Sequence, residues 1–109
     1  MENISEFKKS DYREFYSMLE FVTAIRRTLK VATWGAHGWI KMNDQLLRFR
    51  VQARRHRGYI FVAVNGLDLF DVWLTGLKGN VKKEFNNLYA EDFISVIDTE
   101  IEFIPEYKR

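Results

Sequence analysis

The segment Leu47-Arg48-Phe49-Arg50-Val51-Gln52-Ala53 alternates apolar and polar residues, and this alternation decides the fold. A period of two is typical of a strand with one buried face. The run Arg54-Arg55-His56-Arg57-Gly58 interrupts the alternation, and Tyr59-Ile60-Phe61-Val62-Ala63-Val64 resumes as a second strand. Asn65-Gly66 ends that strand with a strong hairpin signal. We therefore expect residues 39–75 to form consecutive antiparallel strands.

The lengths of the turns set the register of these strands. A turn at Asn43-Asp44 would place Ile40 opposite Leu47, and a four-residue loop at 54–57 would place Val51 opposite Ile60. At Asn65-Gly66, a two-residue turn and a three-residue loop would place the side chains of the following strand on opposite faces of the sheet. We prefer the three-residue loop, with Gly66 in the left-handed position of a bulge, because it makes one face wholly apolar. That face would hold Ile60, Val62, Val64, Phe70, Val72 and Leu74.

Helical patterns flank the strands on both sides. Along residues 12–30 an apolar stripe recurs at three- and four-residue spacing, and Asp11 with Glu14 resembles a capping box at its start. The first stripe is Phe15, Leu19, Val22, Ile25 and Leu29. Residues 81–85 read as a fifth, lysine-bearing edge strand, and residues 89–102 read as a second helix. The second stripe is Phe93, Ile94, Ile97 and Ile101.

These elements predict a single α+β domain spanning residues 1–109. Its order is an N-terminal helix, an antiparallel β-meander of about five strands and a C-terminal helix. We expect residues 1–10 to be flexible, although Ile4 and Phe7 offer an alternative in which they fold back onto the body. Pro105 ends the second helix, and residues 106–109 form a tail.

Composition excludes several classes of function. The 109 residues, 47% of them hydrophobic, are enough for one core, and the net charge of +2 is mild. With no cysteine, the chain has no disulfide, thiolate metal site or cysteine nucleophile. The N-terminus lacks the apolar region of a secretory signal, and no segment approaches the roughly 20 apolar residues of a membrane span. We therefore expect a cytosolic protein without a membrane role.

Catalytic and metal-binding motifs are not apparent. The two histidines, His37 and His56, have no serine or acidic partner nearby in the sequence. Asp44, Asp68 and Asp71 are scattered carboxylates, whereas a hard cation needs several converging oxygens. We expect a non-enzymatic protein that uses no cofactor or metal. An enzyme assembled from dispersed residues is a distant alternative.

A basic and aromatic surface is the strongest functional signal. No acidic residue occurs between Asp44 and Asp68, a segment that carries five arginines. In the preferred register, arginines and aromatic residues project together from the face opposite the core, and the arginine-rich loop extends that face. Arginine forks beside aromatic planes suit phosphates and bases, and they are also enriched at protein interfaces. The candidate contacts are Trp39, Lys41, Arg48, Arg50, Arg54, Arg55, His56, Arg57, Tyr59, Phe61 and Trp73.

Three interpretations of this face compete. The first helix covers it, a protein partner or a second copy of the chain binds it, or single-stranded DNA or RNA binds it. The acidic C-terminal part, which contains Glu84, Glu91, Asp92 and Asp98, would attract a basic face and repel phosphate. We therefore rank a homodimer or a protein partner above nucleic acid. Which interpretation holds depends on whether the face is open to solvent.

Overall fold

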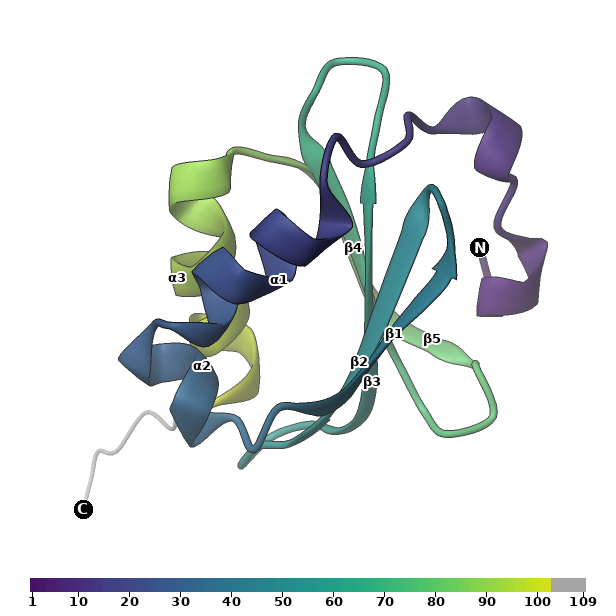
Figure 1. Cartoon of the computed structure of the whole chain (residues 1–109). Helices are drawn as coiled ribbons and strands as arrows, with labels where there is room; N and C mark the ends of the chain where they lie inside the picture. Colours follow the sequence, from purple (N-terminus) through teal and green to yellow (C-terminus); the bar gives the residue numbers. More distant parts are fainter. Residues whose placement is uncertain (103–109) are drawn as a thin grey trace.

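The computed structural model describes residues 1–102, and it confirms the α+β architecture (Figure 1). Five antiparallel strands form one sheet in the order β1-β2-β3-β4-β5, so each strand pairs with its neighbours in sequence. The strands are β1 His37–Asn43, β2 Leu46–Gln52, β3 Arg57–Val64, β4 Phe70–Thr75 and β5 Val81–Leu88. The helices are the 3₁₀ turns η1 Ile4–Glu6 and η2 Lys9–Asp11, then α1 Met18–Arg26, α2 Leu29–Thr33 and α3 Ala90–Ile101. The expected tail and Pro105 lie outside the described residues.

The strands β3 and β4 show the predicted facing but not the predicted loop. Ile60 pairs with Leu74 and Val62 pairs with Val72, which confirms the apolar grouping. The connecting loop is longer than predicted, however, because the last pair joins Val64 to Phe70. Its left-handed residue is Asp68, with φ 62°, rather than Gly66. Adding two residues to a loop leaves the facing of a strand unchanged, since side chains alternate with a period of two.

The loop is held by the side chain of Asn65. Its Oδ1 accepts hydrogen bonds from the backbone N–H groups of Leu67 and Leu69, at 2.9 and 3.2 Å. Asparagine commonly stabilises turns in this way. The loop length therefore follows from these two hydrogen bonds, a possibility that the Asn65-Gly66 dipeptide does not reveal.

The β1–β2 pairing departs from the predicted register. Ile40 pairs with Arg48 and Lys41 pairs with Leu47, with irregularities on both sides of these pairs. A shift of one residue moves a side chain to the opposite face. Trp39 accordingly stacks on Phe49 on the core face, with ring centroids 4.2 Å apart. At the β2–β3 hairpin, Phe49 rather than Val51 lies opposite Ile60, a two-residue shift that preserves the facing.

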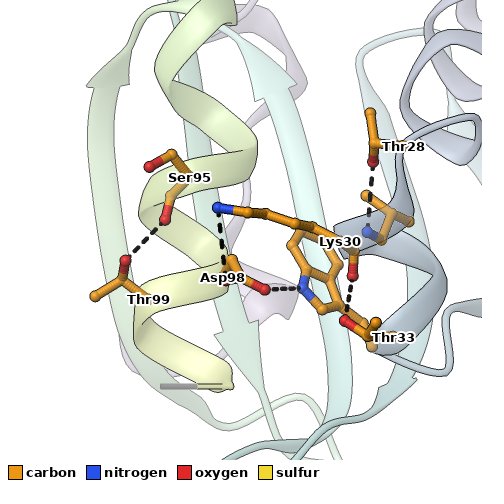
Figure 2. A network of polar contacts seen from close by, with 8 residues as sticks. Thr28, Lys30, Thr33, Ser95, Asp98 and Thr99 are labelled. Atoms are coloured by element: carbon orange, nitrogen blue, oxygen red, sulfur yellow. Dashed lines mark hydrogen bonds and ion pairs between the residues drawn. The ribbon is translucent and has the colours of Figure 1, made fainter. Parts of the chain in front are cut away.

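All three α-helices cover one face of the sheet, which we call the first face (Figure 1). Trp34, which directly follows α2, is fully buried there, and its indole N–H donates a 2.9 Å hydrogen bond to Asp98 of α3. The ammonium group of Lys30 lies 3.9 Å from the same carboxylate (Figure 2). The buried core includes Ile25, Val31, Trp34, Leu47, Phe49, Val51, Ile60, Val62, Val72, Leu74, Phe93, Ile97 and Ile101.

The first helix begins later than predicted. Residues 12–17 directly before it are not helical, and the backbone N–H of Arg13 bonds to the carbonyl of Val64. Ser17 is the N-cap, because its hydroxyl accepts a hydrogen bond from the N–H of Glu20. Asp11 therefore caps no α-helix, and the Ser-x-x-Glu pattern at 17–20 is the real capping signal. Leu19 and Leu29, two members of the predicted stripe, are 78% and 85% exposed.

The N-terminal segment covers part of the opposite face, which we call the second face. The N–H of Ile4 bonds to the carbonyl of Gly79, and the N–H of Val81 bonds to the carbonyl of Glu2. These bonds bring Ile4 and Phe7 against the sheet, as the fold-back alternative for residues 1–10 requires. The interpretation in which the first helix covers this face does not hold, because the segment that contains the two 3₁₀ turns packs there instead. No helix within residues 1–102 has the length and apolar character needed to cross a membrane.

Candidate binding surface

The second face has a covered half and an open half. In the covered half, the Trp73 ring lies edge-on to Phe7 and Tyr12, each with a centroid separation of 5.7 Å. Trp73 is 0% exposed and Phe61 is 3% exposed. The expectation that these two aromatic residues project from an open surface is therefore wrong. Phe7 precedes every predicted helix and strand, and Tyr12 begins the predicted first helix, so neither residue was expected to lie there.

Two further candidates lie elsewhere. Trp39 packs on Phe49 on the first face, and Lys41 is exposed and forms a 2.8 Å ion pair with Asp44. Their placement follows from the shifted β1–β2 register. Neither side chain therefore joins the predicted surface.

The open half retains the arginines of β2 and β3 around Tyr59. The guanidinium carbon of Arg48 lies 4.3 Å from the centroid of the Tyr59 ring, a cation–π contact. Arg50 pairs with Tyr59 across the two strands, and Gln52 pairs with Arg57. We call the set Arg48, Arg50, Arg54 and Arg57 the basic strip. Tyr59 is its only half-buried aromatic neighbour among the predicted contacts in the described part of the chain.

The basic strip has unused donors. The Nε atoms of Arg48 and Arg50 are buried and have no hydrogen-bond partner within residues 1–102. Within residues 1–102, none of the four arginines forms an ion pair; the three pairs there involve Arg13, Lys30 and Lys41. A buried charged donor without a partner is costly. Each of these two arginines is half-buried as a whole, so part of the residue remains open to solvent.

The loop between β2 and β3 carries Arg54 of the basic strip and is fixed to α3. The backbone N–H of Arg54 donates to Glu102 Oε1 at 2.9 Å, and that of Arg55 donates to the Ile101 carbonyl at 2.7 Å. The side chains of Arg54, Arg55 and Arg57 are exposed. The carbonyl at a helix C-terminus would otherwise lack a donor, so this contact also caps α3. These hydrogen bonds hold the backbone of the loop in place, and its cationic side chains extend from it into solvent.

His56 belongs to the interior of this loop. It is 6% exposed, and its Nε2 lies 3.1 Å from the Tyr59 carbonyl. Because a carbonyl only accepts, Nε2 carries the proton. Burial lowers the pKa of His56, and the charge of Lys82 lowers it further. The ring is therefore a neutral structural group, although we predicted it as a contact residue.

A polar cluster joins the N-terminal segment to the end of the sheet. Asp71 is buried, and its Oδ1 accepts hydrogen bonds from the Asn65 side chain and the Asn87 backbone at 2.9 and 3.0 Å. Burial and the nearby Asp71 carboxylate raise the pKa of Tyr12 well above its usual range. The sequence does not predict this cluster, because its residues lie far apart along the chain. It holds Tyr12 over the covered half of the second face.

Two grooves border these elements. One, of about 820 Å³, lies between the segment before α1 and the β3–β4 loop, and Arg13, Glu20 and Phe70 are among its walls. The other, of about 360 Å³, lies between the N-terminal segment and the second face, and Arg48 and Tyr59 are among its walls. The basic strip thus reaches into the smaller groove through Arg48.

The two histidines of the described residues both lie beside backbone carbonyl groups. His37 Nδ1 lies 2.7 Å from the Gly35 carbonyl, so each histidine contacts a backbone carbonyl. Residues 1–102 contain no group of three or more His, Cys, Asp or Glu side chains able to hold a metal ion. Comparisons with protein-family models, with curated proteins and with solved structures gave no match.

Proposed function

We propose that this chain is a non-enzymatic protein-binding module, and that its basic strip contacts a carboxylate-rich surface of a partner protein. The observation that supports this is that the four arginines of the basic strip keep part of their surface in water and form no ion pair within residues 1–102. A guanidinium fork matches a carboxylate in a bidentate, charge-assisted pair. Because Arg48 is already stacked on Tyr59, it is held in one orientation and loses little side-chain entropy on binding.

Nucleic acid is the less supported partner. Proteins that bind single strands stack bases on exposed aromatic rings. Trp73 is buried under Phe7 and Tyr12, Phe61 is also buried, and Arg48 already covers one face of Tyr59. The remaining arginines would contact phosphates without a stacking platform, which favours the protein partner.

Self-association is a second candidate, favoured by an exposed apolar and acidic surface on the N-terminal side. Tyr16 is 100% exposed and Leu19 is 78% exposed, and the neighbouring Glu14 and Glu20 are also exposed. Exposed aromatic and aliphatic side chains often mark contact surfaces. Their acidic neighbours complement the basic strip of another copy, which would steer the encounter.

The test uses two probes, a labelled oligoglutamate peptide and a labelled single-stranded oligouridine. We expect fluorescence anisotropy to show that the chain binds oligoglutamate, that physiological salt weakens the binding, and that Arg48→Gln with Arg50→Gln lowers the affinity about tenfold or more. The matched control is Arg26→Gln with Arg27→Gln, which removes the same charge from exposed positions at the end of α1. It should change the affinity about twofold or less.

Three results would count against the proposal. Equal losses in the two double variants would show that binding reports net charge alone. Tight oligouridine binding that depends on Arg48 and Arg50, with no oligoglutamate binding, would favour nucleic acid. A dimer in light scattering that Leu19→Ser or Arg48→Gln dissociates would instead favour self-association.

A further inference from the structure

The smaller groove combines apolar walls with cations. Ile4, Met42 and Leu77 contribute apolar walls, and Arg48 and Lys78 contribute positive charge. Its volume of about 360 Å³ is near the lower end of the range for ligand pockets, roughly 300–1,000 Å³. The groove therefore suits one or two side chains rather than a large ligand.

Its apolar walls are unusually open. Met42 is 45% exposed and Leu77 is 56% exposed. An occupant that covered them would gain the free energy of removing their surface from water. The apolar part of the groove thus calls for an aliphatic or aromatic side chain.

The positive charge of the groove favours an occupant that carries a negative charge. The ring of Tyr59 occupies one face of the Arg48 guanidinium, so the N–H groups in the guanidinium plane stay available for an acceptor. Arg48 and Lys78 both line the groove, and none of its lining residues within the described part of the chain is acidic. A carboxylate beside the apolar side chain would meet this need.

We infer that the groove recognises a peptide segment of the partner in which an apolar side chain stands next to an acidic residue. This inference rests on the proposed function, and it adds the chemistry of the partner's anchor. The apolar side chain enters beside Met42 and Leu77, and the adjacent carboxylate pairs with Arg48. Arg50 lies outside the groove and contacts further acidic residues of the same partner.

The experiment compares three labelled peptides by anisotropy: a leucine flanked by glutamates, the same peptide with serine in place of leucine, and the same peptide with glutamines in place of glutamates. We expect the first to bind about tenfold more tightly than the second, the order expected for burying one leucine side chain. The third should bind at least about tenfold more weakly than the first.

Two variants locate the anchor. Leu77→Ser changes an exposed groove residue, so it should keep the fold while removing most of the preference for leucine over serine. Leu19→Ser alters a leucine of greater exposure outside the groove, and it should leave that preference unchanged. Arg48→Gln should weaken binding of the leucine peptide, and Arg48→Lys should restore it only in part, because lysine lacks the fork.

The outcomes separate this inference from the proposed function. If leucine and serine peptides bind equally and both depend on Arg50, the anchor is overturned and the proposed function stands. If neither acidic peptide binds, both are overturned. If a second copy of the chain occupies the groove, light scattering will show a dimer that the leucine peptide fails to displace, and the peptide anchor is overturned.

Discussion

The Arg48 guanidinium lies over the Tyr59 ring at 4.3 Å, at the boundary between the covered and open halves of the second face. Beside it, Phe61 is buried in the same cluster as Trp73, whereas Arg48 and Tyr59 keep part of their surface in water. The N-terminal segment therefore sets how far the open half of the second face extends. This division makes the segment part of the folded core and leaves the arginines partly exposed.

Removing Phe7 should destabilise the fold although the residue belongs to no strand or α-helix. Its ring stacks on Tyr12 at 4.8 Å and meets Trp73 edge-on, so Phe7→Ala should lower the free energy of unfolding by about 1–3 kcal/mol in urea titrations. Tyr16→Ala is the control, because that ring is fully exposed, and it should change the free energy by about 0.5 kcal/mol or less. Equal effects would mean that the N-terminal segment contributes no packing.

The start of α1 can be tested at its cap. Ser17 accepts a hydrogen bond from the Glu20 N–H at 3.2 Å, so Ser17→Ala should cost about 1 kcal/mol of unfolding free energy. Asp11→Ala should cost about 0.5 kcal/mol or less, because Asp11 is exposed and begins no α-helix. The reverse order, measured by urea denaturation followed by circular dichroism, would restore the longer helix that the apolar stripe predicts.

Two glycines should respond differently to alanine. A Cβ on Gly58 would come close to the carbonyl oxygen of Thr75 on the neighbouring strand, so Gly58→Ala should cost about 1–3 kcal/mol or more. A Cβ on Gly66 would meet no atom within 4 Å, and Gly66 has no left-handed backbone, so Gly66→Ala should stay within about 0.5 kcal/mol. Thermal unfolding of both variants checks this. A large loss in Gly66→Ala would support the left-handed bulge first predicted there.

The stability of the protein should fall in mild acid because of His56. Burial holds its pKa in the folded chain below the ordinary value of 6.5. The unfolded chain therefore binds a proton first as the pH falls, and stability present above about pH 6.5 is lost below it. Urea titrations at several pH values should show a smaller acid loss in His56→Gln than in the unaltered protein. An identical pH dependence would contradict the buried, neutral ring.

The alternation of residues 47–64 predicts the strands and the apolar face because both depend on local periodicity. The same logic places α3 correctly, since Phe93, Ile97 and Ile101 are all buried. When the predicted loop length is wrong by an even number of residues, each side chain still lies on the predicted face of the sheet, as it does after the β3–β4 loop. At β1 the error is odd, and Trp39 therefore lies on the face opposite to the one predicted.

The candidate site is less predictable because its limits depend on contacts between distant residues. Nothing local marks Phe7 and Tyr12 as the cover of Trp73, and the Tyr12–Asp71 contact spans much of the chain. The run of arginines does predict the basic strip. The sequence does not predict which aromatic residues beside the strip are exposed. The face of the sheet on which a residue lies does not show whether another segment covers it.

The most direct test of the binding surface is a backbone amide NMR titration with the oligoglutamate peptide. We predict that the largest shift changes fall on β2 around Arg48 and Arg50, on Tyr59 of β3 and on the Arg54–Arg55 loop. Small changes are expected over α1 and over the first turn of α3. Changes concentrated on the helices, or no change at peptide concentrations that saturate the anisotropy signal, would contradict the proposal that the basic strip is the contact surface.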